Sequence, residues 1–67
     1  MKIFYLVVSM FRTLPPSVGV FDTWSQACAW RYSTNRPGYV LKAAFDKEGR
    51  ILWTKQLACR FSVEEEL

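Results

Sequence analysis

Apolar residues occupy both alternating faces of the first segment of the chain, residues 2–12. Phe4 and Leu6 fall on one face of an extended strand, and Tyr5 and Val7 fall on the other. A strand that is apolar on both faces belongs in the interior of a sheet. Two prolines at positions 15 and 16 interrupt the pattern, and SVGVF (17–21) resumes it as a short second strand. The two segments predict an antiparallel hairpin.

A helix-start signal follows the second strand. Thr23, with Gln26 three residues later, is a capping-box pattern, which satisfies backbone N–H groups at a helix start. Asp22 or Thr23 can cap this helix, which we expect to run to about Thr34, where TNRPG breaks the pattern. Trp30 is predicted to pack the helix onto the sheet, whereas Trp24 lies beside the cap, where a partner can reach it.

The clearest hairpin signal lies in the second half of the chain, where YVLKAAF (39–45), DKEG (46–49) and RILWTKQLACRF (50–61) follow one another. Gly49 suits a positive φ in the turn. Apolar residues fall on the odd-numbered positions of both strands, which predicts one core face and one polar face that both strands share. The last segment, SVEEEL (62–67), is either a short helical turn capped by Ser62 or an acidic frayed end.

These elements predict one α+β domain over residues 1–67, a four-stranded antiparallel sheet with one helix packed on one face (β-β-α-β-β). The helix connects the second strand to the third, so a spatial order 2-1-3-4 places the doubly apolar first strand inside the sheet. A chain of this length buries only about 60% of the surface that it exposes when unfolded. One helix covers one face, and the uncovered face must meet either a second copy or a target protein.

The net charge is +3, but three of the six acidic residues are the consecutive glutamates at positions 64–66. Basic side chains interleaved with aromatic ones suit phosphate neutralisation and base stacking, and they equally suit an acidic protein surface. Ordinary solvation of surface lysines explains them as well. The candidate partner-binding residues are Trp24, Arg31, Tyr32, Arg36, Lys42, Trp53 and Arg60.

Catalytic chemistry has almost no support in the sequence. The chain has no histidine, no nucleophile motif and no glycine-rich phosphate loop, and its carboxylates do not form an acid/base pair. Cys28 and Cys59 lie 31 positions apart without a CxxC spacing, which argues against a zinc site. We therefore expect a non-enzymatic protein without metal or cofactor.

The two cysteines and the N-terminus bear on the compartment. Small reduced core residues are a simpler interpretation of Cys28 and Cys59 than a disulfide, which favours the cytoplasm. The start of the chain imitates a signal peptide, since Lys2 precedes an apolar run, but no A-x-A-like cleavage site follows. The run is also far shorter than the ~20 apolar residues that span a bilayer, so we expect a retained strand and no membrane partner.

The layout of the whole chain, with its apolar first strand, VGVFDTWSQA and PGYVLKAAFD, resembles the small β-β-α-β-β accessory proteins encoded by bacteriophages. Some compact phage proteins of this size inhibit host defence, including anti-CRISPR proteins. The resemblance implies a phage or prophage protein in the cytoplasm of a bacterial host. Such a protein would bind and inhibit a host protein complex such as a CRISPR effector.

A second resemblance is local. GVFDTWSQACAW followed by RPGYVLKAAF is similar to the N-terminal hybrid-binding domain of cellular ribonucleases H, the viroplasmin-like family. The resemblance implies that Trp24 lies near a nucleic-acid backbone and that Lys42 contacts phosphate, with Tyr5 as a looser match. This chain departs from the family where SMFRTLPPS replaces a short basic turn and where the hairpin ending in ILWTKQ replaces a second helix.

Three functions are therefore expected as alternatives. The first is inhibition of a host protein complex by binding. The second is a small basic nucleic-acid-binding module that uses Trp24, Arg31, Arg36 and Lys42. The third is a self-associating structural protein, a homodimer that pairs through the uncovered sheet face.

Overall fold

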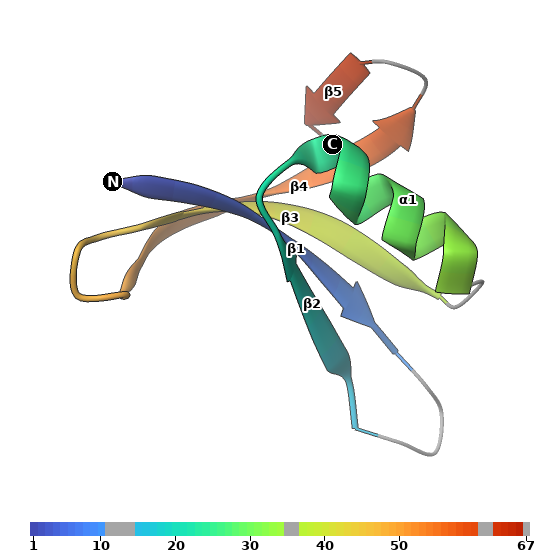
Figure 1. The fold of residues 1–67 in the computed structure, drawn as a ribbon, viewed down its shortest axis with the longest axis horizontal. Coiled ribbons are helices and arrows are strands. Elements are labelled where there is room, and N and C mark those ends of the chain that lie inside the picture. Colours follow the sequence, from blue (N-terminus) through green and yellow to red (C-terminus); the bar gives the residue numbers. More distant parts are fainter. Residues whose placement is uncertain (11–14, 35–36, 61–62, 67) are drawn as a thin grey trace.

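The computed structural model describes residues 1–10, 15–34, 37–60 and 63–66, with side chains for all of these except residues 34, 60 and 63–66. One open sheet and one helix make up this part of the chain (Figure 1). The elements are β1 (Lys2–Ser9), β2 (Ser17–Phe21), α1 (Trp24–Thr34), β3 (Gly38–Phe45), β4 (Ile51–Arg60) and β5 (Val63–Glu66). No helix in the described part is long and apolar enough to cross a membrane.

The sheet is antiparallel throughout, with the strand order β2-β1-β3-β4-β5. The predicted β-β-α-β-β succession and the order 2-1-3-4 of the first four strands are confirmed, and β1 lies inside the sheet between β2 and β3. β1 ends at Ser9 rather than at residue 12. Its register with β2 and β3 runs to Ser9, and one further backbone bond follows, from the N–H of Met10 to the carbonyl of Pro37 at 2.9 Å. Residues 11 and 12 lie outside the described part.

The C-terminal segment forms a fifth strand, so the predicted helical turn or frayed end at 62–67 is wrong. Val63–Glu66 pairs antiparallel with the last four residues of β4, from Leu57 to Arg60. The backbone groups on the outer edge of β4 would otherwise lack partners, and an extended segment satisfies them. Residues 61, 62 and 67 lie outside the described part of the chain.

The helix starts where the capping pattern predicts. The backbone N–H of Gln26 donates to Oγ1 of Thr23 at 3.2 Å, and α1 ends at Thr34 as expected. One face of α1 packs on β1 and β3 through Ala27, which is fully buried against Val7 and Val40. A side chain as small as alanine lets the helix lie close to the sheet. This contact forms the centre of the thin core.

Aromatic side chains extend this core towards β2. Trp30 packs against the buried cluster, and its ring centroid lies 5.8 Å from that of Phe21. The prediction that Trp30 packs the helix onto the sheet is confirmed. Gly19 lies beneath the Phe21 ring, where an added Cβ would lie only 2.9 Å from a ring carbon.

A disulfide between Cys28 and Cys59 joins the middle of α1 to the end of β4, so the expectation of two reduced core cysteines is wrong. Cys28 belongs to the buried core and Cys59 packs against it. Their Cα atoms lie 5.6 Å apart, within the range that a disulfide spans. Disulfides persist in oxidising compartments. The two cysteines therefore no longer support a cytoplasmic location, and that location stays a prediction.

A β-bulge decides which side chains of β4 face the helix. Phe45 pairs with Ile51, but Ala44 pairs with Trp53, so Leu52 is an extra residue in β4. A one-residue shift in register turns every following side chain to the opposite face. The predicted shared face of odd-numbered residues is therefore wrong, because Leu57 shares its face with Val40 and not with Leu41.

The turn between β3 and β4 is held by Asp46. Its carboxylate accepts hydrogen bonds from the backbone N–H groups of Glu48 and Arg50, both at 2.9 Å, and from Nε of Arg50 at 3.0 Å. The backbone N–H of Arg50 is the largest cause that holds the pKa of Asp46 below its ordinary value. Gly49 has a φ of +81°, as the sequence predicts for this turn.

The face of the sheet opposite α1 is apolar on three neighbouring strands. The register places on it the even-numbered residues of β1 and β2 and the odd-numbered residues of β3. We call this surface the open face, defined by Phe4, Leu6, Val8, Val18, Val20, Tyr39, Leu41, Ala43 and Phe45. On β4 the same face carries Ile51 beside Phe45 and then Thr54 and Gln56, so the apolar surface ends within β4.

Replacing both cysteines by alanine tests the disulfide. The bond closes a loop with a sequence separation of 31 residues, and loop-closure entropy predicts that its loss lowers the free energy of unfolding by about 3–4 kcal/mol. Urea unfolding of the wild type and of the Cys28→Ala/Cys59→Ala variant measures this difference. Reduction of the wild type must reproduce the loss, and equal unfolding midpoints with and without reductant would show that no disulfide forms.

Deletion of Leu52 tests the bulge. Without the extra residue, Ile51 and Trp53 become consecutive and keep their partners, so we expect the free energy of unfolding to change by only about 1 kcal/mol or less. Deletion of Thr54 is the matched control, because it moves Trp53 to the opposite face and should destabilise the chain more. Urea unfolding and the cross-strand nuclear Overhauser contact between Trp53 and Ala44 separate the two outcomes.

Candidate functional site

The structure separates the seven predicted partner-binding residues into groups. Lys42 and Trp53 lie close together on the helix-bearing face of the sheet, at the part that the helix leaves uncovered. Arg31 and Tyr32 lie in the last turns of α1. Arg36 lies outside the described residues, and Arg60 is described only as the last backbone position of β4.

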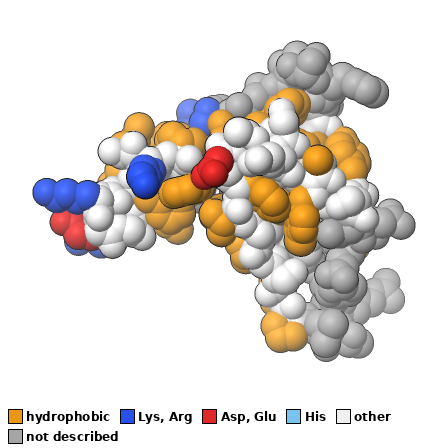
Figure 2. Space-filling view, viewed as in Figure 1, with side chains coloured by type: hydrophobic (Ala, Val, Ile, Leu, Met, Phe, Trp, Pro, Cys, Tyr) orange, Lys and Arg blue, Asp and Glu red, His pale blue; other side chains and the backbone are white. Residues whose placement is uncertain are grey.

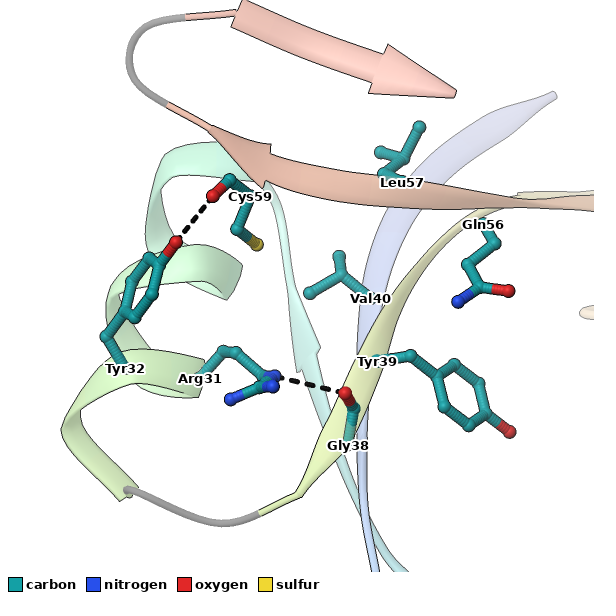
Figure 3. Close-up of a pocket in the computed structure, with 8 residues that line it drawn as sticks. All are labelled: Arg31, Tyr32, Gly38, Tyr39, Val40, Gln56, Leu57 and Cys59. Carbon is teal, nitrogen blue, oxygen red and sulfur yellow. Dashed lines mark hydrogen bonds between the residues drawn. The ribbon is translucent and has the colours of Figure 1, made fainter. Parts of the chain in front are cut away.

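Arg31 and Tyr32 hold the end of α1 against the sheet. Nε of Arg31 donates to the backbone carbonyl of Gly38 at 3.2 Å, and the hydroxyl of Tyr32 donates to the carbonyl of Cys59 (Figure 3). The two side chains line a pocket of about 190 Å³ between the helix end, β3 and β4. Both predicted binding residues therefore have a structural role at the start of β3 and the end of β4.

Trp24 is the first residue of α1 and is half-buried. Its indole Nε1 is buried and has no hydrogen-bond partner among the described residues. Trp30 is half-buried as well. The sequence predicted that Trp24 would be more exposed than Trp30, but both side chains are half-buried. They differ in their contacts, because Trp30 packs against the core cluster.

Two lysines and two aromatic residues form a compact group beside the helix. Lys42 pairs with Lys55 across β3 and β4, Nζ of Lys42 lies 5.8 Å from the centre of the Tyr5 ring, and Nζ of Lys55 lies 5.5 Å from that of Trp53. These distances suit cation–π attraction, which offsets part of the repulsion between the two like charges. We call this group, Tyr5, Lys42, Trp53 and Lys55, the lysine–aromatic cluster.

The view onto the helix-bearing side shows how hydrophobic and charged side chains are distributed. Hydrophobic side chains lie around its middle, where a basic group and an acidic group are also visible, and a mixed group of charges lies at the tip of the β3–β4 hairpin on the left (Figure 2). Ala44, which the register places between Ile3 and Trp53, is fully buried there.

Sequence reasoning missed Lys55 as a member of this cluster. The spacing of Lys55 and Trp53 places them on one face of a strand, but their pairing with Lys42 and Ala44 depends on the bulge at Leu52. Short-range alternation carries no information about a one-residue insertion in the partner strand. The signal that the sequence did contain was the apolar first strand, which predicted an uncovered apolar face.

The open face is concave near the ends of β1 and β3. A pocket of about 710 Å³ is lined there by Phe4, Leu6, Val20 and Phe45 together with the hairpin tip. The rings of Phe4 and Phe45 meet edge to face with their centroids 5.6 Å apart. Lys2 and Lys47 also line this pocket, and both are exposed.

The chemistry of both surfaces is that of binding. The open face offers apolar side chains, and the lysine–aromatic cluster offers two cations and two rings. Among the described residues, no three His, Cys, Asp or Glu side chains gather into a group that would hold a metal ion.

Comparisons of the chain with models of protein families, with curated proteins and with solved structures find no match. The resemblances to phage accessory proteins and to the hybrid-binding domain of ribonucleases H stay predictions.

Proposed function

We propose that this chain is a non-enzymatic binding module that engages another protein through the open face of its sheet. The observation that carries the proposal is the apolar surface on three adjacent strands, on the side opposite the single helix. Two of its residues, Val18 and Val20, are 56% and 59% exposed, although both are β-branched apolar residues in a strand. Contiguous exposed apolar surface of this kind is typical of interaction sites.

The surroundings of the pocket define the chemistry of the partner surface. Its apolar centre is flanked by the exposed cations Lys2 and Lys47, whereas the nearby carboxylate of Asp46 is paired with Arg50. An apolar protein surface with an acidic rim complements this arrangement, since the apolar centre supplies most of the affinity and the rim charges supply orientation.

The phage-type layout supports a finer version of this proposal. We propose that the partner belongs to a host protein complex, with a defence system such as a CRISPR effector as the leading candidate. A module that binds through an apolar face inhibits such a complex by occupying a surface that the complex needs, without chemistry of its own. This proposal implies the cytoplasm of the bacterial host, where the disulfide between Cys28 and Cys59 must resist reduction.

A substitution in the middle of the open face tests the proposed interaction. Leu6→Lys places a charge in the desolvated contact, and we expect the affinity for a partner captured by the wild type to fall at least about tenfold. Isothermal titration calorimetry with the purified partner measures the change. Ala29→Lys, on the exposed surface of α1, is the matched control and should bind like the wild type.

Circular dichroism must show that Leu6→Lys remains folded. If it does not, Tyr39→Lys provides the test, because Tyr39 is on the open face and is already exposed. A partner that binds the folded open-face variant as tightly as the wild type contradicts the proposal.

The lysine–aromatic cluster supports a second candidate function, binding of single-stranded nucleic acid. Its two lysines lie on adjacent strands, with Tyr5 and Trp53 beside them. Cations that neutralise phosphates next to rings that stack on bases are the usual means of binding single strands. The similarity of Lys42 to a phosphate-contacting residue of the hybrid-binding domain agrees with this candidate.

Salt dependence tests the nucleic-acid candidate. Each phosphate contact with a single strand contributes about 0.7 to the slope of log K against log salt. The Lys42→Gln/Lys55→Gln variant should therefore lower the slope by about 1.4, as measured by fluorescence anisotropy with a labelled oligonucleotide. Lys47→Gln at the hairpin tip is the control, and a slope that the double variant leaves unchanged removes the candidate.

A further inference from the structure

The two edges of the sheet differ sharply in charge. β5, at one edge, has the sequence VEEE, and β2, at the other edge, has the sequence SVGVF with no charged residue and no proline. Charged residues and prolines are the usual means by which a sheet edge avoids pairing with another chain. β5 has this protection along its length, whereas β2 has it only at its flanks, where Pro16 precedes Ser17 and Asp22 follows Phe21.

The outer edge of β2 presents backbone groups that are ready to pair. β2 pairs with β1 on its inner side, and no strand in the described part of the chain pairs with its outer side. On the helix-bearing side of β2, the ring of Phe21 occupies the space above Gly19. A strand that approaches the edge therefore meets only backbone at the middle residue of β2.

We propose that two copies of this chain pair through β2, antiparallel, and form one continuous sheet across a two-fold axis at Gly19. This register pairs all five residues of β2, whereas a shift in either direction leaves residues unpaired. Val18 then lies opposite the partner's Val20, and Val20 lies opposite the partner's Val18. Both contacts are between β-branched side chains, which pack well across strands.

The open face explains why a second copy fits this edge. Its apolar side chains lie on β2, β1 and β3, and they give way to Thr54 and Gln56 on β4. Pairing through β2 places the apolar strips of the two copies side by side, so the exposed Val18 and Val20 come to lie inside one apolar surface twice as wide. Pairing through β5 would instead bring rows of glutamates together, which repel each other.

The expected dimer is weak. A pairing of two five-residue strands buries less than the roughly 1,200 Å² that marks a stable interface, and each copy carries a net charge of +3. We therefore expect a dissociation constant in the micromolar range or above. The proposal does not depend on a foreign partner, because it requires only a second copy of this chain at the β2 edge.

Sedimentation velocity over a concentration series is the test. The wild type should change from monomer to dimer as its concentration rises to about 1 mM. Val18→Glu and Val20→Lys should each weaken the dimer at least tenfold, because each places a charge opposite an apolar side chain. Tyr39→Lys, on the open face but on β3, is the control and should dimerise like the wild type.

Mixing the variants tests the register. In an equimolar mixture of Val18→Glu and Val20→Lys, the introduced carboxylate faces the introduced ammonium group and the dimer should reform as a heterodimer. A mixture of Val18→Lys and Val20→Lys should stay monomeric, because two cations then face each other. Circular dichroism checks that every variant is folded.

Three results would overturn the proposal. The first is a wild type that stays monomeric throughout the series, and the second is a dimer that neither single variant weakens. The third is a failure of the complementary mixture to dimerise. None of these results depends on a foreign partner, so a failure here is distinguishable from a failure of the proposed interaction through the open face.

Discussion

The contact of Ala27 with Val7 and Val40 determines how the rest of the molecule is arranged. It lets one short helix lie close to the two central strands, and the disulfide between Cys28 and Cys59 fixes the helix to the far strand of that core. In the described part of the chain, no second helix covers the opposite face of the sheet. The same contact that builds the core therefore leaves three strands of apolar side chains uncovered. A small core of this kind commonly needs a covalent link, which the disulfide supplies.

The register of the β3–β4 hairpin is the second constraint. The extra residue Leu52 turns Trp53, Lys55 and Leu57 onto the helix-bearing face. If Leu52 instead paired with Ala44 without a bulge, Leu57 would turn to the opposite face and Lys55 would no longer lie opposite Lys42. The hairpin, the turn glycine and the strand order were predictable from the sequence, because turn residues and apolar alternation are local signals. The relation between the faces of two strands is not local, since one inserted residue reverses it, and so the shared face of odd-numbered residues was wrong.

The features of the candidate site also divide into those that local sequence predicts and those that depend on the pairing of distant strands. The doubly apolar pattern of β1 is visible in the sequence, and it led directly to an uncovered face. The membership of the lysine–aromatic cluster depends on three strands and one bulge, and only Lys42 and Trp53 were found beforehand. Arg31 and Tyr32 were selected for their chemistry, but their hydrogen bonds go to backbone carbonyls of the same chain. The disulfide and β5 were missed because cysteine spacing and an acidic tail do not indicate a partner strand or a partner thiol.

An uncovered apolar face links the stability of this protein to its binding. Any molecule that binds the folded chain and not the unfolded chain stabilises the folded state by mass action. Because the helix-bearing face holds the buried core and the open face holds exposed apolar side chains, a partner on the open face adds a second hydrophobic layer to a sheet that has only one. Binding and completion of the fold are then one event. The charged edge at β5 and the uncharged edge at β2 restrict where a further chain can join the sheet, whereas the open face is the surface that we propose for a protein partner.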